Sequence, residues 1–167
     1  TCPLKGLIYI MDEPCKGLHY RDIKSIIQST RELIDNDNTV IAIEHNKQYI
    51  ASADNVVQLG PVGGPKGGYI IDVKKKKSDY KYKLSFKATK ETQKYITISD
   101  INFRNIKHQD VRIPIGAITC VTGVSGSGKT TLTSVVSSCF ERKNNAYCKA
   151  FEADNTIKRV LRVNQAP

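Results

Sequence analysis

Apolar residues in the first third of the chain form short continuous runs separated by a segment with helical spacing. Residues 7–11 (LIYIM), 38–45 (NTVIAIEH) and 55–60 (NVVQLG) have the length and character of strands buried in a parallel sheet. Between the first two runs, over residues 20–34, isoleucines recur at spacings of three and four, which predicts an amphipathic helix. A second, shorter helix is expected before residue 55. Alternation of strand and helix predicts an α/β fold.

The rest of the chain adds further strand signals after a glycine-rich turn at residues 60–69 (GPVGGPKGGY). Strand patterns recur at residues 69–73, 95–101, 111–123 and 157–163, and a helical pattern covers residues 129–140. The strand predicted at 111–123 leads directly into a second glycine-rich loop and then into that helix. We therefore expect a partial parallel or mixed sheet with flanking helices.

The second glycine-rich loop, residues 123–130 (GVSGSGKT), has the pattern G-x-x-x-x-G-K-[ST] between a predicted strand and a predicted helix. Glycines let the backbone curl so that its N–H groups and the positive end of the helix face phosphate oxygens. Lys129 is expected to meet the β- and γ-phosphates, and Thr130 to offer a hydroxyl to Mg²⁺. This predicts a P-loop that binds ATP or ADP. The predicted nucleotide contacts are Gly123, Ser125, Gly126, Ser127, Gly128, Lys129, Thr130 and Thr131.

Two acidic residues follow the first apolar run. Asp12, at the end of a buried strand, is expected to hold the water shell of Mg²⁺, and Glu13 to act as the general base that polarises an attacking water. The alternative is that both residues merely begin a turn before Pro14. His45 also follows a buried strand, where it is expected either to bond a γ-phosphate or to serve a structural role.

Positive charge is concentrated between residues 72 and 94. The chain of 167 residues has a formal net charge of +10, and this segment holds nine lysines against three acidic residues. The run Lys74, Lys75, Lys76 and Lys77 is interpreted either as a solvated linker or as a contact with DNA phosphates.

The cysteines and the hydropathy of the chain argue against a disulfide-linked, zinc-binding or membrane-spanning protein. The five cysteines are odd in number, scattered and never in a C-x-x-C pair, so neither a zinc site nor a disulfide framework is expected. No apolar run approaches the roughly 18 residues that span a bilayer. We expect a cytoplasmic chain with no membrane partner, and, because it lacks an initiating methionine, a piece of a longer protein.

Several motifs together resemble the UvrA family, the damage-recognition subunit of the bacterial excinuclease. Residues 12–14 (DEP), 17–22 (GLHYRD), 38–46 (NTVIAIEHN) and 53–68 (ADNVVQLGPVGGPKGG) resemble the end of the first ATP-binding half of that family. Residues 96–132, which include the loop GVSGSGKT, resemble the start of the second half, and residues 160–167 (VLRVNQAP) its Q-loop segment.

This resemblance implies a division of the chain and accounts for the acidic strand preceding the glycine-rich loop. Residues 1–73 would be the end of the first ABC-type ATPase half, 74–94 a lysine-rich linker, and 95–167 the beginning of the second half. Asp12, Glu13 and His45 would then complete one ATP site while Lys129 and Thr130 belong to another. Gln165 would contact nucleotide and Mg²⁺.

Beyond ATP and Mg²⁺, the resemblance implies DNA as a partner and a homodimer that works with other excinuclease subunits in nucleotide excision repair. The alternatives are a UvrA-like drug-resistance protein or another ABC-type ATPase that does not act on damaged DNA. Cys15 and Lys16 depart from the family, which usually has Ser-Ile before Gly-Leu-His.

Two ATP sites, each incomplete, predict that this chain binds nucleotide but hydrolyses it negligibly, since Glu13 and Lys129 would not meet at one phosphate. The alternative is that the strands ending at Asp12 and Gly123 lie side by side and build one hybrid site.

Overall fold

The computed structural model describes residues 4–71, 94–142 and 146–163. The predicted DNA contacts at 74–77 and the predicted nucleotide contact Gln165 lie outside the described residues.

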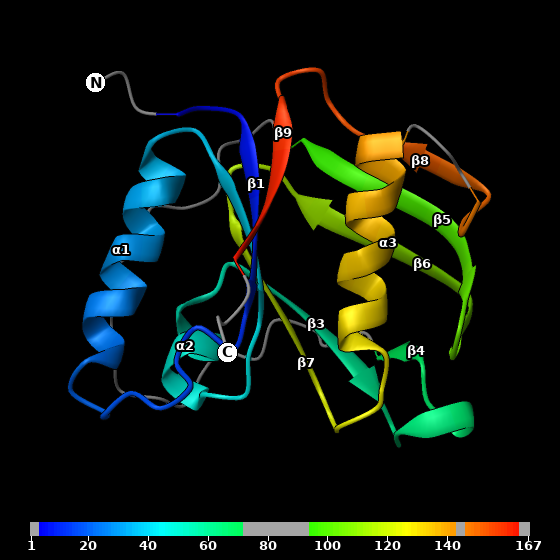
Figure 1. The fold of residues 1–167 in the computed structure, drawn as a ribbon, viewed down its shortest axis with the longest axis horizontal. Coiled ribbons are helices and arrows are strands. Elements are labelled where there is room, and N and C mark those ends of the chain that lie inside the picture. The colour runs from blue at the N-terminus through cyan, green and yellow to red at the C-terminus, as the bar shows by residue number, and fades with distance from the viewer. Residues whose placement is uncertain (1–3, 72–93, 143–145, 164–167) are drawn as a thin grey trace.

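A six-stranded, mostly parallel sheet forms the centre of the molecule (Figure 1). Its order is β4-β3-β7-β2-β1-β9, and only β4 runs antiparallel to its neighbour. The strands are β1 (Leu7–Asp12), β2 (Thr39–Ile43), β3 (Asn55–Gly60), β4 (Tyr69–Ile71), β7 (Ile118–Gly123) and β9 (Arg159–Val163). This confirms the predicted α/β class with a mixed sheet.

Strands from both ends of the chain alternate in this sheet. β7 lies between β2 and β3, and β9 lies beside β1. Residues before position 73 and residues after position 95 therefore share one sheet and one core, while the division into three segments stays a prediction.

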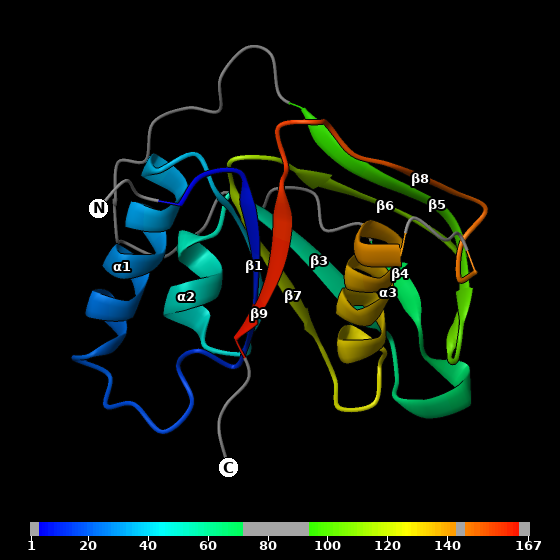
Figure 2. The same ribbon diagram turned by 45° about the horizontal axis from the view of Figure 1, so that its top comes forward.

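Helices cover both faces of the sheet (Figure 2). α1 (Ile23–Asp35) and α2 (Lys47–Ser52) lie on one face, and α3 (Lys129–Arg142) lies on the other. Side chains alternate accordingly along β2, because successive residues of a strand point to opposite faces. Val40 and Ala42 pack with α1 residues, whereas Ile41 and Ile43 pack with α3 residues.

A second sheet covers the outer side of α3. It contains β5 (Tyr95–Phe103), β6 (Ile106–Pro114) and β8 (Ala150–Glu152), all antiparallel. Buried residues of β5 and β6, such as Ile98 and Ile113, share one cluster with Leu132 and Val136 of α3. α3 is thus held between two sheets (Figure 2). This packing fixes the position of the glycine-rich loop, which leads into the first turn of α3.

The structure confirms most predicted elements but divides one predicted strand into two. The single strand predicted at 111–123 is wrong, because β6 ends at Pro114 and β7 begins at Ile118 in the other sheet. Pro114 lacks a backbone donor, and Gly116 adopts φ 69°, so the chain turns between the two sheets. β8 lies in a segment, residues 141–155, for which the sequence predicts no element.

The α-helices found in the described part of the chain are too short or too polar to cross a bilayer.

A partly buried ion pair joins α1 to the central sheet. Arg31 donates from Nη1 to both carboxylate oxygens of Asp54, at 2.9 and 2.7 Å, and from Nη2 to the Ser52 carbonyl. The same carboxylate accepts the Ile118 N–H of β7 at 2.7 Å. One side chain therefore connects α1, the start of β3 and β7.

We expect Asp54→Ala to lower the free energy of unfolding by about 3 kcal/mol, because it leaves the Arg31 guanidinium without its carboxylate in a site with little solvent. Urea unfolding followed by circular dichroism measures this change. The control is Lys5→Ala, which removes the exposed Lys5–Asp37 pair and should cost at most about 1 kcal/mol. Equal losses in both variants would contradict the structural role of Asp54.

Candidate functional site

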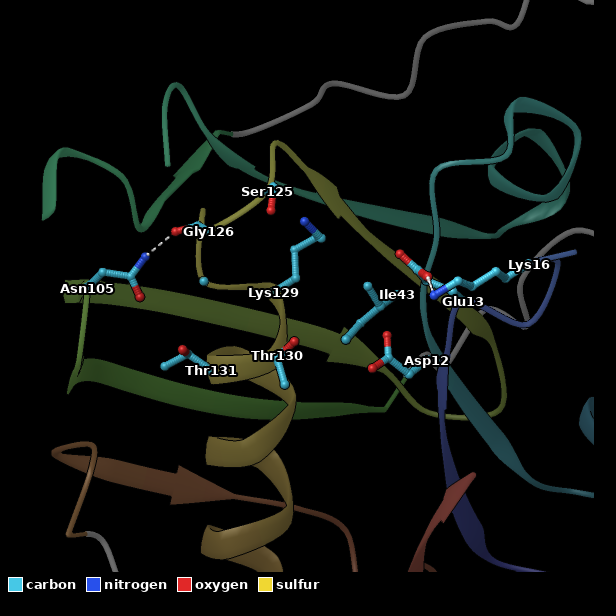
Figure 3. A pocket seen from close by; sticks show the side chains of 11 residues that line it. Asp12, Glu13, Lys16, Ile43, Asn105, Ser125, Gly126, Lys129, Thr130 and Thr131 are labelled. Carbon is cyan, nitrogen blue, oxygen red and sulfur yellow. Dashed lines mark hydrogen bonds and ion pairs between the residues drawn. The ribbon is translucent and has the colours of Figure 1, made fainter. Parts of the chain in front are cut away.

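A pocket of about 450 Å³ opens at the carboxyl ends of the central parallel strands (Figure 3). It is lined by Asp12, Glu13, Lys16, Ile43, Asn105, Ser125, Gly126, Gly128, Lys129, Thr130 and Thr131. The strands ending at Asp12 and Gly123 are not neighbours, since β2 lies between them. Because all three are parallel, their ends still meet at one edge of the sheet.

The glycine-rich loop forms one wall of the pocket between β7 and α3. Gly123, Gly126 and Gly128 have φ values of 141°, 73° and 105°, which side chains other than hydrogen rarely allow. A Cβ atom at Gly123 would collide with the carbonyl oxygen of Leu59 in β3. Gly123 and Ser127 belong to the loop without lining the pocket, and Ser127 is fully buried.

Lys129, the first residue of α3, extends back over this loop. Its Nζ donates to the carbonyl oxygens of Gly123 and Val124, both at 2.9 Å. Burial lowers the pKa of Lys129, and the negative charges of Glu13 and Asp12 oppose that shift. The ammonium group is therefore held against the loop, where it would contact an anion bound by the loop.

The opposite wall is formed where β1 ends. Asp12 is its last residue, and Glu13 follows with φ 47° while its N–H donates to the Ile43 carbonyl at 2.9 Å. The Glu13 carboxylate lies 3.2 Å from Lys16 Nζ and 4.0 Å from His45 Nε2. His45 reaches the site through Glu13 and does not itself line the pocket.

Glu44 anchors this wall, although the sequence does not predict it as a site residue. Its buried carboxylate accepts the Cys15 N–H at 2.8 Å and the N–H groups of His45 and Asn46 at 2.6 Å each. Burial, then the charge and hydrogen bond of Glu44, raise the pKa of Cys15 to about 12. An acidic residue ending an apolar run, as in TVIAIE, is the only sequence signal for this role.

Asn105 is a second residue that the sequence does not predict. It lies in the turn between β5 and β6, and its Nδ2 donates to the Gly126 carbonyl at 3.0 Å (Figure 3). The Gly64 N–H donates to the same oxygen at 3.0 Å. Two segments that are distant in sequence therefore donate hydrogen bonds to one peptide of the loop. No local sequence pattern predicts these contacts.

The structure brings together most of the predicted site residues that it describes, in one place instead of two. Asp12, Glu13, Lys129 and Thr130 line a single pocket in this chain, whereas the resemblance assigns them to separate ATP sites. The reason is the alternation of strands, which sets β1 and β7 in one sheet. Within the described ranges, no group of three or more His, Cys, Asp or Glu side chains is arranged to hold a metal ion.

The chain is similar to curated proteins named UvrABC system protein A. It is 36% identical to the protein of Methanothermobacter thermautotrophicus, 34% identical to that of Treponema pallidum and 33% identical to that of Aquifex aeolicus, in each case over 98% of this chain. No family model matches the chain.

The matched region is a minor part of each relative. The chain spans about a fifth of the length of these relatives, 19% of the first two and 20% of the third. The similarity nonetheless extends over both the acidic end of β1 and the glycine-rich loop, since it covers nearly the whole chain. On this basis the chain belongs to the UvrA family.

Proposed function

We propose that this chain binds ATP or ADP with Mg²⁺ in the pocket between the glycine-rich loop and the end of β1, as a P-loop NTPase of the ABC ATPase type. The observation that carries this is the convergence of Lys129, Thr130, Asp12 and Glu13 on one pocket. A phosphate-binding loop and an acidic strand end are the two parts that nucleotide chemistry requires.

Each wall has a distinct task in binding. The loop N–H groups and the start of α3 bind phosphate oxygens, and Lys129 adds an ammonium group for the outer phosphates. Thr130 and Asp12 would hold Mg²⁺, which prefers oxygen ligands and would neutralise phosphate charge when bound. A hydroxyl and a carboxylate lining the same pocket fit that ion.

Glu13 is proposed as the general base. Its fixed backbone, held by the Ile43 carbonyl, aims a carboxylate into the pocket within reach of His45. A carboxylate so placed orients a water toward the terminal phosphate. Because Glu13 and Lys129 share one pocket here, we expect slow but measurable turnover in place of the negligible turnover that separate sites predict. We expect the rate to stay low because the 167 residues of the sequence include no segment that resembles the signature motif, which in ABC-type ATPases closes over the nucleotide.

For the whole protein we propose ATP-dependent recognition of damaged DNA in nucleotide excision repair. The support is membership of the UvrA family and the basic segment at residues 72–94. DNA, other excinuclease subunits and a second copy of the protein are the partners that go with this proposal, and the cytoplasm is its location.

Lys129→Ala should weaken ADP binding. The lost charge-assisted contact is worth about 1.5–3 kcal/mol, which corresponds to roughly 10- to 150-fold in affinity. Isothermal titration of ADP in the presence of Mg²⁺ measures the change. Lys149→Ala, an exposed lysine of the second sheet region, removes the same charge and should leave affinity unchanged. Equal affinity of Lys129→Ala and the unaltered chain would refute the proposed site.

Glu13→Gln should reduce steady-state phosphate release by about 10²- to 10⁴-fold while leaving ADP affinity within a factor of about three, because the amide cannot accept the water proton. The exposed Glu32→Gln on α1 is the matched control. Turnover that survives Glu13→Gln, or ATP binding without any turnover in the unaltered chain, would restore the assignment of Glu13 and Lys129 to separate sites.

Replacing the four lysines at 74–77 with alanine should flatten the salt dependence of DNA binding. Each lost phosphate contact reduces the slope of log K against log salt by about 0.9, so the full change is roughly 3–4. Fluorescence anisotropy with a random-sequence duplex at several salt concentrations measures it. An unchanged slope would identify the segment as a solvated linker.

A further inference from the structure

Lys16 lines the pocket although it lies outside the glycine-rich motif. Its Nζ lies 3.2 Å from Glu13 Oε2. In Figure 3 this pair lies across the pocket from the glycine-rich loop and Lys129. The site thus has a cation on each side, one of which the glycine-rich motif does not include.

The backbone around Lys16 is fixed while its side chain is not. The Lys16 N–H donates to the Glu13 carbonyl at 2.9 Å, and the preceding Cys15 N–H is held by buried Glu44. By contrast, the side chain of Lys16 is 64% exposed and that of Glu13 is 36% exposed. An ion pair this exposed to solvent contributes little free energy, so the ammonium group can leave Glu13 for another anion at a small cost in free energy.

We propose that Lys16 is a second cationic contact for the terminal phosphate of a bound nucleoside triphosphate, and so favours triphosphate over diphosphate. This rests on the proposed function, in which Glu13 orients water beside that phosphate. The ammonium group of Lys16, paired with Glu13, lines the pocket in which that phosphate would lie. Lys129 approaches it from the loop, and Lys16 approaches it from the end of β1.

Charge decides which partner Lys16 takes. A terminal phosphate carries more negative charge than the single Glu13 carboxylate, so it attracts the ammonium group more strongly. A diphosphate ends closer to the loop and leaves the Glu13–Lys16 pair intact.

The test compares affinities for ADP and for a non-hydrolysable ATP analogue, each with Mg²⁺, by isothermal titration. Lys16→Ile should weaken binding of the analogue by about two- to fivefold, within the range for a solvent-exposed charge contact, and leave ADP affinity unchanged. Lys16→Arg should retain the preference for the analogue. Lys5→Ile is the matched control, since it removes the same charge from another exposed ion pair, Lys5–Asp37, outside the pocket.

The outcomes separate this inference from the function on which it rests. If the unaltered chain binds both nucleotides and Lys16→Ile changes neither affinity, or weakens both equally, the role of Lys16 is wrong and the nucleotide site stands. If the unaltered chain binds neither nucleotide, the proposed function is wrong and the inference falls with it. Matching thermal unfolding of Lys16→Ile and Lys5→Ile excludes a folding defect as the cause of any difference.

Discussion

The parallel pairing of β7 with β2 is the contact on which the pocket depends. Val40 lies beside Ile118 and Ile43 beside Val121, although these segments are far apart in the sequence. The hydrogen bonding continues past the strand ends, because the Glu44 N–H donates to the Val121 carbonyl and the Glu13 N–H to the Ile43 carbonyl. The two walls of the pocket are therefore joined through β2 by backbone hydrogen bonds, whose geometry leaves little freedom of spacing.

The glycine-rich loop is held in shape by its neighbours before any ligand is present. Gly126 offers one carbonyl to both Asn105 and Gly64, and the turn after β3 lies so close to the loop that a Cβ atom at Gly63 would collide with the Ser125 carbonyl. Such a loop loses little conformational entropy when it binds an anion, so more of the contact energy is available for affinity. Its rigidity comes from tertiary contacts in addition to its own glycines.

The sequence predicts individual strands and the glycine-rich loop, but it does not predict which distant segments come into contact. Apolar runs identify β1, β2 and β3, and the glycine pattern identifies the loop, because both depend on a few neighbouring residues. The order of the strands depends on which buried surfaces meet, and it decides whether Glu13 and Lys129 share a pocket. The roles of Glu44 and Asn105 cannot be predicted from the sequence for the same reason, because their hydrogen-bond partners lie in other segments. The split between β6 and β7 was more accessible, as Pro114 and Gly116 both disfavour a continuous strand.

The charges of the pocket explain why a cation on the side of β1 would favour phosphate binding. Two carboxylates, Asp12 and Glu13, face the place where phosphates would lie, and like charges repel. Lys129 is engaged by the loop carbonyls and offsets that repulsion from one side only. With an uncharged side chain at position 16, the carboxylate wall would depend on Mg²⁺ to make it compatible with a phosphate. With lysine there, the wall carries its own counter-charge, because the ammonium group of Lys16 lies beside the Glu13 carboxylate at the pocket surface.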